Sequence, residues 1–269
     1  MNDYKLGVIG GGNMGSAIVG GAVRSGFLAG GEILISEPLD AKRVQLSANL
    51  GVTCVDNIPA TAGCEKILLA VKPQVMPQII PIVAANLADD TLIISIAAGL
   101  NTKFFDAALN GRGRIVRVMP NTPMLVGEGA SAVCSGPRAT AADVEWTKKL
   151  LTAGGGTVVE VEEKQMDAVT AVSGSGPAYF FYLLEAMIDA GVAEGLSRET
   201  ATLLAVQTCK GSAVLQNVTG ESPEELRRKV TSPGGTTQQA IDVFDAEKTK
   251  ETMIRAVRAA ADKSRLLGR

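Results

Sequence analysis

Short, nearly continuous apolar runs alternate with longer helix-like segments through the first 160 residues of the chain. The runs predicted as strands are Leu6–Ile9, Ile33–Ser36, Val52–Val55, Ile67–Val71, Leu92–Ile96, Ile115–Met119, Ala130–Cys134 and Thr157–Val161. Because most of them lack polar alternation, we expect helices to cover both faces of the sheet that they form.

Segments with helical spacing separate these runs. They are Met14–Ser25, Ala41–Asn49, Val75–Leu87, Lys103–Leu109 and Ala141–Leu151. Strands and helices that alternate in this way predict an α/β fold with a parallel, doubly wound sheet of the Rossmann type. Pro77 and Pro81 interrupt the third helical segment, where we expect a kink or an early break.

After about residue 162 the strands stop, and helical segments rich in Ala, Leu and Met follow. They are Gln165–Val172, Ala178–Glu194, Arg198–Asn217, Pro223–Val230, Thr237–Phe244 and Lys248–Leu267. This change predicts two domains, the sheet domain over residues 1–162 and an all-α domain over residues 163–269. The apolar stripes of the second domain fit either an ordinary core or a subunit interface.

Composition narrows the chemistry. Apolar residues make up 46% of the 269 residues, enough for a sizeable core. Lys and Arg number 26 against 28 Asp and Glu, so we expect neither a nucleic-acid surface nor a membrane patch. The chain has no histidine, which excludes Ser–His–Asp and Cys–His catalysis and any histidine-ligated metal. We therefore expect no metal, and chemistry carried by main-chain groups, hydroxyls, lysines, carboxylates or a bound cofactor.

The cysteines and the first residues indicate the compartment. Cys54, Cys64, Cys134 and Cys209 are widely spaced and form no C-x-x-C pair, so we expect buried thiols rather than disulfides or zinc ligands. The chain begins with an apolar run that glycines soon interrupt, unlike a signal peptide. No apolar stretch approaches the ~20 residues that span a bilayer. These features predict a cytoplasmic protein.

A glycine-rich turn follows the first predicted strand. Gly10, Gly12 and Gly15 form G-x-G-x-x-G, with Asn13 and Met14 between the last two. Gly10 allows the tight turn, Gly12 lets the main chain approach a pyrophosphate, and Gly15 lets the helix pack on the strand. The helix N-terminus then faces the phosphate charge. Because the glycine motif lies between the first predicted strand and the first predicted helix, we interpret it as a dinucleotide-binding turn rather than a flexible loop.

The end of the second predicted strand bears on the choice of dinucleotide. Ser36 and Glu37 lie about 20 residues beyond the glycine turn, where a carboxylate accepts hydrogen bonds from the adenosine ribose. Such a carboxylate favours NADH and repels the 2′-phosphate of NADPH. Lys42 and Arg43 lie close in sequence and can offset that repulsion, so both cofactors stay open.

Three further segments follow strands, at the sheet edge where α/β proteins bind ligands. They are Ala70–Gln74, Ser95–Gly99 and Arg117–Pro123. Small side chains in the second segment leave room for a ring, and a lysine in the first can contact ribose or phosphate. In the third segment, two prolines stiffen a loop that we expect to present Asn121 and Thr122.

Two glycine-rich turns mark the helical half, Ser173–Pro177 and Ser232–Thr237. In the second turn, exposed N–H groups of Gly235, Thr236 and Thr237 at a helix start would form a nest for a small carboxylate. The Thr237 hydroxyl both donates and accepts, which suits a neighbouring nitrogen. Each turn also reads simply as a helix cap.

Together these motifs resemble the pyrroline-5-carboxylate reductase family, which makes L-proline. The match covers essentially the whole chain, and the stretch from Leu226 to Thr237 resembles the family's signature. The resemblance implies a Rossmann domain followed by a helical dimerisation domain, and self-association as a dimer or a decamer of dimers. It implies pyrroline-5-carboxylate and proline as substrate and product, with NADPH or NADH as cofactor.

The resemblance also implies roles for individual residues. Those that would touch the cofactor are Gly10, Gly12, Asn13, Met14, Gly15, Ser36, Glu37, Asn57, Ala70, Val71, Lys72, Pro73, Ala97 and Ala98. Those that would bind the substrate are Gly235, Thr236 and Thr237, with Glu163 and Lys229 as weaker candidates and Thr237 as the catalytic residue. Many family members carry a small polar residue where Glu37 stands, a departure that bears on the usual NADPH preference.

Two rival functions are weaker. A β-hydroxyacid dehydrogenase also joins a Rossmann domain to helices, but it carries a lysine on its interdomain helix, and the segment from Ala178 to Gly195 contains none. A non-catalytic dinucleotide sensor would keep the glycine turn but would not need the turn from Ser232 to Thr237.

Overall fold

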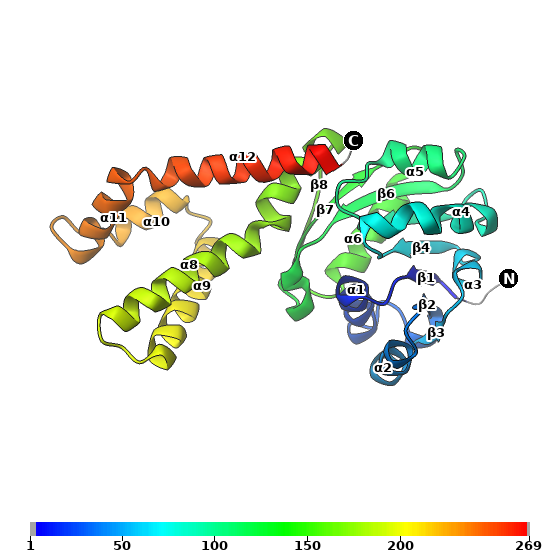
Figure 1. Cartoon of the computed structure of the whole chain (residues 1–269), viewed down its shortest axis with the longest axis horizontal. Coiled ribbons are helices and arrows are strands. Elements are labelled where there is room, and N and C mark those ends of the chain that lie inside the picture. The colour runs from blue at the N-terminus through cyan, green and yellow to red at the C-terminus, as the bar shows by residue number, and fades with distance from the viewer. Residues whose placement is uncertain (1–3, 268–269) are drawn as a thin grey trace. The chain divides into compact units, whose positions relative to one another are not determined.

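The computed structural model describes residues 4–267, which contain an eight-stranded sheet in the order β3-β2-β1-β4-β5-β6-β7-β8 (Figure 1). The strands are β1 (Leu6–Ile9), β2 (Ile33–Ser36), β3 (Thr53–Val55), β4 (Lys66–Leu69), β5 (Leu92–Ser95), β6 (Arg114–Met119), β7 (Ala130–Ser135) and β8 (Thr157–Glu160). All eight predicted strands are confirmed, since each predicted apolar run overlaps one strand of the sheet.

Six strands run parallel, but β7 lies antiparallel to β6, and β8 lies parallel to β7. The prediction of a parallel sheet is therefore wrong for its last two strands. The reason is the connection. Only a short 3₁₀ segment, Thr122–Val126, joins β6 to β7, whereas parallel neighbours need a crossover of about a dozen residues or more.

Helices follow most strands of the sheet. They are α1 (Asn13–Arg24), α2 (Asp40–Leu50), α3 (Ile58–Ala62), α4 (Met76–Asn86), α5 (Thr102–Ala108) and α6 (Ala141–Thr152). The five predicted helices are confirmed, and the short α3 was not predicted. Of the kink or early break expected in α4, the early break is wrong, because Pro77 falls in its first turn, where no N–H bond is lost, and the helix continues past an exposed Pro81. The kink stays a prediction.

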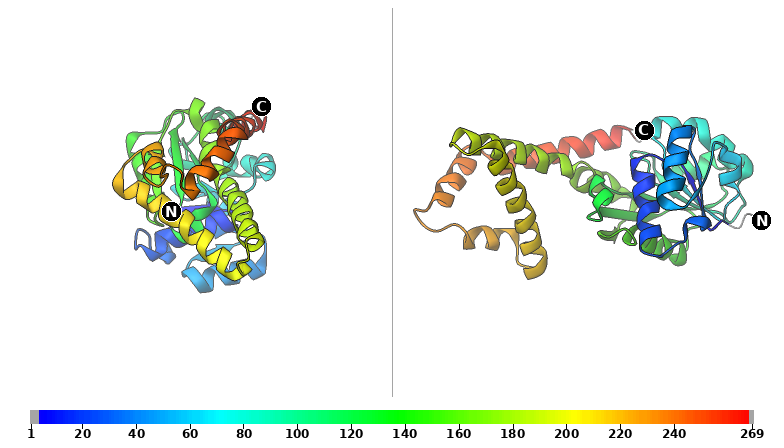
Figure 2. Two further views of the ribbon diagram at one scale, coloured as in Figure 1. Left: turned by 90° about the vertical axis from the view of Figure 1, so that its left-hand side faces the viewer. Right: turned by 90° about the horizontal axis from the view of Figure 1, so that it is seen from below.

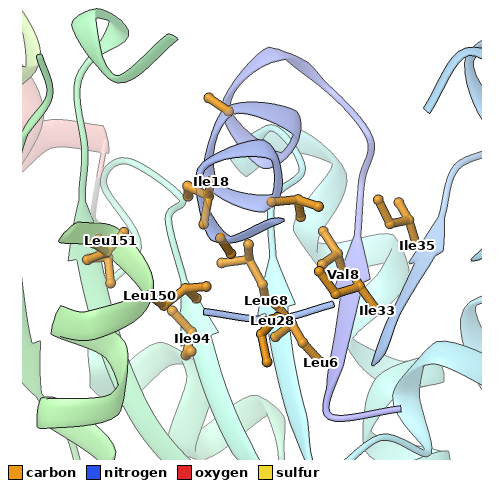
Figure 3. Close-up of a cluster of buried hydrophobic side chains, with 14 of the residues drawn as sticks. Leu6, Val8, Ile18, Leu28, Ile33, Ile35, Leu68, Ile94, Leu150 and Leu151 are labelled. Carbon is orange, nitrogen blue, oxygen red and sulfur yellow. The ribbon is translucent and has the colours of Figure 1, made fainter. Parts of the chain in front are cut away.

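The core lies on both faces of the sheet, as expected for a doubly wound fold. Figure 3 shows the cluster on one face, where Leu6 and Val8 of β1 meet Ile18 of α1 and Leu150 of α6. The second cluster packs α4 and α5 on the other face, with Phe105 at its centre fully buried. The central strands β1, β2 and β5 are buried along their whole length, whereas the edge strands β3 and β8 are partly exposed.

Beyond β8, the described residues are mostly helical. They comprise α7 (Met166–Val169), a single π-helical turn (Thr170–Gly174), α8 (Gly176–Ala193), α9 (Arg198–Thr219), α10 (Pro223–Lys229), α11 (Thr236–Ala246) and α12 (Thr249–Leu267). Contacts divide the chain into two compact units. The sheet unit holds the described residues up to Ser175 and those from Ala260 onward, and the helical unit holds Gly176–Ala259.

In the helical unit, α8 and α9 lie side by side (Figures 1 and 2). The end of α12 packs with the sheet unit instead, where the Ser264 hydroxyl donates to Asp167 at 2.6 Å. The domain division at residues 162 and 163 follows sequence composition and stays a prediction. None of the helices in residues 4–267 has both the length and the apolar character needed to cross a membrane.

Candidate functional site

The glycine turn has the geometry that its sequence predicts. Gly10 adopts φ +106°, and a Cβ there would lie 2.8 Å from the main-chain oxygen of Ala70. A Cβ at Gly15 would lie 2.5 Å from the main-chain oxygen of Gly10, so only glycine lets α1 pack this close to β1. The Gly10 N–H donates to the Ser36 oxygen at 2.9 Å, which ties the turn to β2.

Gly12 differs from its two neighbours in the motif, because a Cβ there would meet no atom within 4 Å. It is the N-cap of the 12-residue helix α1 and supplies no side-chain acceptor. The first N–H groups of the helix have no intrahelical partner, and the helix dipole adds positive potential at this end. The open space beside Gly12 is therefore suited to a phosphate.

That space belongs to a cavity of about 510 Å³ at the carboxyl ends of β1, β4, β5 and β6. Its lining residues are Gly12, Asn13, Met14, Lys42, Ala70, Val71, Lys72, Pro73, Ile96, Ala97, Ala98, Met119 and Pro120. Nine of these are among the predicted cofactor residues, contributed by three separate segments of the sequence. The cavity joins a helix N-terminus to two lysines and an apolar wall, the kinds of group that bind a phosphate and a flat ring.

Four lining residues were not predicted: Lys42, Ile96, Met119 and Pro120. The last three belong to strand-end segments that the sequence did single out, so their position after a strand was the available signal. Lys42 lies in the first turn of α2; the sequence singled it out only as a cation near a possible 2′-phosphate, and the structure places it in the cavity lining.

The predicted cofactor residues Ser36, Glu37 and Asn57 do not line the cavity. Ser36 is buried and accepts the Gly10 N–H. The Glu37 side chain, 5% exposed, accepts the Gly11 N–H at 3.0 Å. Asn57 caps the short helix α3, where its side chain accepts the Ala60 N–H at 3.3 Å.

Gly11, the middle glycine of the turn, has a role that the motif does not express. A Cβ there would lie 2.6 Å from Leu46 Cδ1 and 3.1 Å from Glu37 Oε2. A side chain at this position would therefore make Leu46 and the Glu37 carboxylate shift. The sequence shows three glycines in a row, and the fold shows that the second one lies against these two side chains.

In the loop after β6, the Asn121 side chain points into the protein and forms hydrogen bonds there instead of facing solvent. Asn121 is 8% exposed, and its amide donates to the Ser173 oxygen at 3.1 Å and accepts the Ala130 N–H at 2.9 Å. The expectation that the loop presents Asn121 is therefore wrong, because the side chain satisfies buried main-chain groups. The π-helical turn also packs on the cavity wall, since a Cβ at Gly174 would lie 2.5 Å from Met119 Cε.

A second polar cluster lies between β6, β7 and α5 in the sheet unit. The Glu163 carboxylate forms an ion pair with Arg117, which is 4% exposed, and accepts the Thr102 N–H at 3.1 Å. Burial raises the pKa of Glu163, but the Thr102 hydrogen bonds and the Arg117 charge outweigh it, so the pKa lies below its ordinary value. Burial and the nearby Glu163 carboxylate raise the pKa of Cys134 to about 12. Glu163 is thus already engaged, which its sequence position does not reveal.

The bend from Ser232 to Thr237 lies in the helical unit and leads into α11. Gly234 adopts φ +72°, and Gly235 is the N-cap of α11 without a side-chain acceptor. The Gly235 N–H donates to the Ser232 oxygen at 3.0 Å, so the nest predicted from three N–H groups keeps those of Thr236 and Thr237. Lys229 is paired with Glu221.

The described residues hold no cluster of three or more carboxylates and cysteines able to bind a metal ion. What the chain offers instead is a nucleotide cavity in one unit and, in the other, a helix start with free N–H groups and a threonine hydroxyl. These groups bind and orient anions and polar atoms, and they suit chemistry in which a cofactor carries the reactive atom.

Comparison with known proteins gives matches along the whole chain. A family model described as pyrroline-5-carboxylate reductase dimerisation matches residues 163–267, and one described as NADP oxidoreductase, coenzyme F420-dependent, matches residues 5–99. A pyrroline-5-carboxylate reductase of Pseudomonas aeruginosa is 41% identical over 98% of this chain and 97% of its own.

Solved structures of the same family resemble this chain over its whole length. A pyrroline-5-carboxylate reductase from Coxiella burnetii is 34% identical with a TM-score of 0.92, and a pyrroline carboxylate reductase from Plasmodium falciparum with NADP bound is 33% identical with a TM-score of 0.89. Both comparisons cover 100% of this chain and 100% of the other.

Proposed function

Since the chain belongs to the pyrroline-5-carboxylate reductase family, we propose that it reduces Δ1-pyrroline-5-carboxylate to L-proline with NADPH or NADH, the last step of proline biosynthesis. One observation carries this proposal. The glycine turn and three strand ends of this chain converge on a single cavity at the N-terminus of α1.

The sheet unit holds the cofactor in this account. The N–H groups at the start of α1 and the lysines Lys42 and Lys72 face the pyrophosphate, and Ala97 and Ala98 leave room for a ring. The bound cofactor supplies the hydride, so the protein positions and polarises the substrate. Met119 and Pro120 form the apolar wall of the cavity and keep water from that side.

The bend before α11 holds the substrate. The N–H groups of Thr236 and Thr237 bind the carboxylate, helped by the positive end of the helix dipole. The Thr237 hydroxyl orients the ring nitrogen. A protonated imine is already electrophilic, so no strong protein acid is needed, which agrees with a chain that lacks histidine.

Gly235 and the two weaker candidates, Glu163 and Lys229, receive indirect roles. Gly235 shapes the bend, because its own N–H closes the turn onto Ser232. Glu163 and Lys229 each hold an ion pair, with Arg117 and Glu221 respectively, so we assign them to the structure around the site rather than to substrate contact.

We also propose that residues 163–269 are the substrate-binding and dimerisation domain, with residues 1–162 as the cofactor domain. The family model over residues 163–267 and the exposed apolar side chains of α8 and α9 support a dimer, and a decamer of dimers is the larger assembly that we propose. All four cysteines are free, which supports a reducing, cytoplasmic location.

Replacing Thr237 with Ala tests the substrate site. We expect kcat/KM for the imine to fall by about 10²-fold, the usual effect of removing one preorganised donor, while the Kd for the reduced cofactor stays the same. Thr252, an exposed threonine of α12, is the control, and Thr252→Ala should leave both values unchanged. An unchanged kcat/KM in Thr237→Ala would reject the role of this hydroxyl.

A further inference from the structure

The π-helical turn Thr170–Gly174 ends in a glycine that lies against a residue of the cavity wall. A Cβ at Gly174 would lie 2.5 Å from Met119 Cε and 3.9 Å from Met119 Cγ, so the methionine side chain takes the space that a side chain at 174 would need. Met119 is the last residue of β6 and lines the cavity beside Pro120. One methionine side chain therefore both contacts the π-helical turn and lines the cavity.

The π-helical turn is tied to the sheet, so it resists moving away from Met119. Asn121 donates from its amide to the Ser173 oxygen at 3.1 Å and accepts the Ala130 N–H at 2.9 Å. In a regular helix the Ser173 oxygen would accept from residue 177, which is a proline without an N–H. A buried side chain thus supplies the missing donor and links the turn to the first residue of β7.

The methionine side chain has its open space on the cavity side. Met119 packs against a cluster of buried residues, namely Ala132, Cys134 and Met166. Close-packed residues of this kind leave no room for a displaced methyl group. A side chain added at Gly174 would displace Met119 Cε, because that atom is the end of a flexible chain and the turn is held. The displaced methyl group would therefore enter the cavity that Met119 lines.

The position of Met119 indicates which part of a dinucleotide it meets. The space beside Gly12, after β1, suits the pyrophosphate. Met119 ends β6, three strands away from β1, or about 14 Å at the usual strand spacing. Its neighbours in the lining are apolar residues that follow β5: Ile96, Ala97 and Ala98. Since the adenosine half of a dinucleotide lies toward β2 in such sheets, the ring that reaches this wall is the nicotinamide.

We propose that Gly174 is a positioning residue for the nicotinamide ring, because the absence of a side chain there lets Met119 form the wall without entering the space of the ring. This inference rests on the proposed function, since both place the reduced cofactor in this cavity. It also gives the turn Ser173–Pro177 a task beyond capping α8, because a helix cap does not require glycine at a position packed on the cavity wall.

Cofactor binding by Gly174→Ala is the first test. The dinucleotide used is whichever of NADH and NADPH the unaltered protein binds more tightly, and its Kd is measured by cofactor fluorescence. The matching fragment without nicotinamide, ADP or 2′,5′-ADP, is measured by titration calorimetry. Gly174→Ala should raise the Kd of the dinucleotide by about tenfold or more, the effect of overpacking a filled site. The Kd of the fragment should change by less than about twofold, because the fragment does not reach Met119.

Gly31→Ala is the matched control. Gly31 is an exposed glycine of the sheet unit with open space where its Cβ would lie, so both Kd values should stay the same.

Truncation of Met119 separates this role from a general loss of packing. Met119→Ala alone should raise the Kd of the dinucleotide by about threefold or more, because the ring loses apolar contact. Adding Gly174→Ala to that variant should change the Kd by less than about twofold, since the new Cβ no longer meets a methyl group.

Three results would overturn the inference. The first is a Gly174→Ala variant with an unchanged Kd for the dinucleotide, even if its urea midpoint falls. The second is an equal loss of dinucleotide and fragment, and the third is an equal effect of Gly174→Ala with and without Met119. If Gly174→Ala alone does not fold, an unchanged Kd in Met119→Ala would overturn the inference instead. Binding of neither dinucleotide by the unaltered protein would reject this inference and the proposed function together, whereas binding without imine reduction would reject the reaction alone.

Discussion

The two units of the chain differ in how far they bury their large apolar side chains. In the sheet unit, whole strands and large side chains such as Phe105 are fully buried. In the helical unit, Phe181 is 59% exposed and Tyr182 is 73% exposed. The buried residues described there are small, namely Gly176, Ala201 and Ala205. The first unit forms its own core, and the second leaves its apolar faces uncovered.

The contrast indicates that the sheet unit buries its apolar side chains within one chain, whereas the helical unit needs a second copy of the chain to bury its own. The helix α8 is mostly apolar, with Glu185 and Asp189 as its charged residues, and a helix of that composition buries most of its surface when it packs. The sheet unit therefore forms the cavity beside Gly12 within one chain. The helical unit, which carries the bend before α11, is expected to depend on self-association for its stability.

The largest expected effect comes from making the same deletion in both units. Phe105→Ala should lower the free energy of unfolding of the sheet unit by about 3–5 kcal/mol, because it empties a fully buried site. Phe181→Ala should change that free energy by less than about 1 kcal/mol. Trp146 is the single tryptophan and packs on Phe27 in the sheet unit, so its fluorescence in urea reports this unit selectively. Equal losses in the two variants would contradict the contrast.

The next effect concerns assembly. Phe181→Glu places a charge on the apolar surface of α8 and should weaken the dimer by about 30-fold or more, the effect of losing about 2 kcal/mol at an interface. Sedimentation over a range of concentrations measures it. Ile82 on α4 is 38% exposed in the sheet unit, and Ile82→Glu should leave the dimer intact. Equal dissociation in both variants would show that the helical unit is not the interface.

The smallest effect is a pH dependence confined to the sheet unit. Because the pKa of Glu163 is lowered in the folded protein, its contribution to stability is complete above its unfolded value of about 4.3 and is lost as the pH falls through the folded value. Acidification below about pH 5 should therefore cost the sheet unit on the order of 1 kcal/mol through this residue.

Glu163→Gln measures that contribution, because glutamine cannot titrate. The urea midpoint of Glu163→Gln, followed by Trp146 fluorescence, should fall less steeply than that of the unaltered protein between about pH 6 and about pH 3.5. An ordinary glutamate carboxyl titrates in this range. Some slope should remain, since the hydrogen bonds from Thr140 and the charge of Arg114 outweigh burial and also lower the pKa of Asp143. Identical slopes with and without the Glu163 carboxylate would reject this assignment.

Local sequence patterns predicted the elements but not their long-range contacts. Continuous apolar runs located all eight strands, and glycine spacing located the turn at Gly10, because both depend on a few neighbouring residues. The reversed direction of β7 depends on how a short loop closes. The partners of Glu37, Asn121 and Glu163 lie 26, 52 and 46 residues away, so only the folded chain brings them together.

The apolar stripes of the helical half show the same limit. Their spacing predicted helices correctly, but spacing alone could not tell an internal core from a subunit interface. The exposure of Phe181 and Tyr182 favours the interface, because a core within one chain would have covered them. The sequence composition located the change from the strand-containing part to the all-helical part. Only the packing indicated that the apolar surface of the helical part is an interface.

The proposed reaction converts a cyclic imine carboxylate to proline while a reduced dinucleotide is oxidised. The most direct measurement incubates the purified protein with Δ1-pyrroline-5-carboxylate and NADH or NADPH, and follows both the loss of cofactor absorbance and the formation of L-proline. We expect one proline to form for each cofactor oxidised with the unaltered protein, and none in a control without enzyme. Cofactor oxidation without proline, or no reaction with either cofactor, would contradict it.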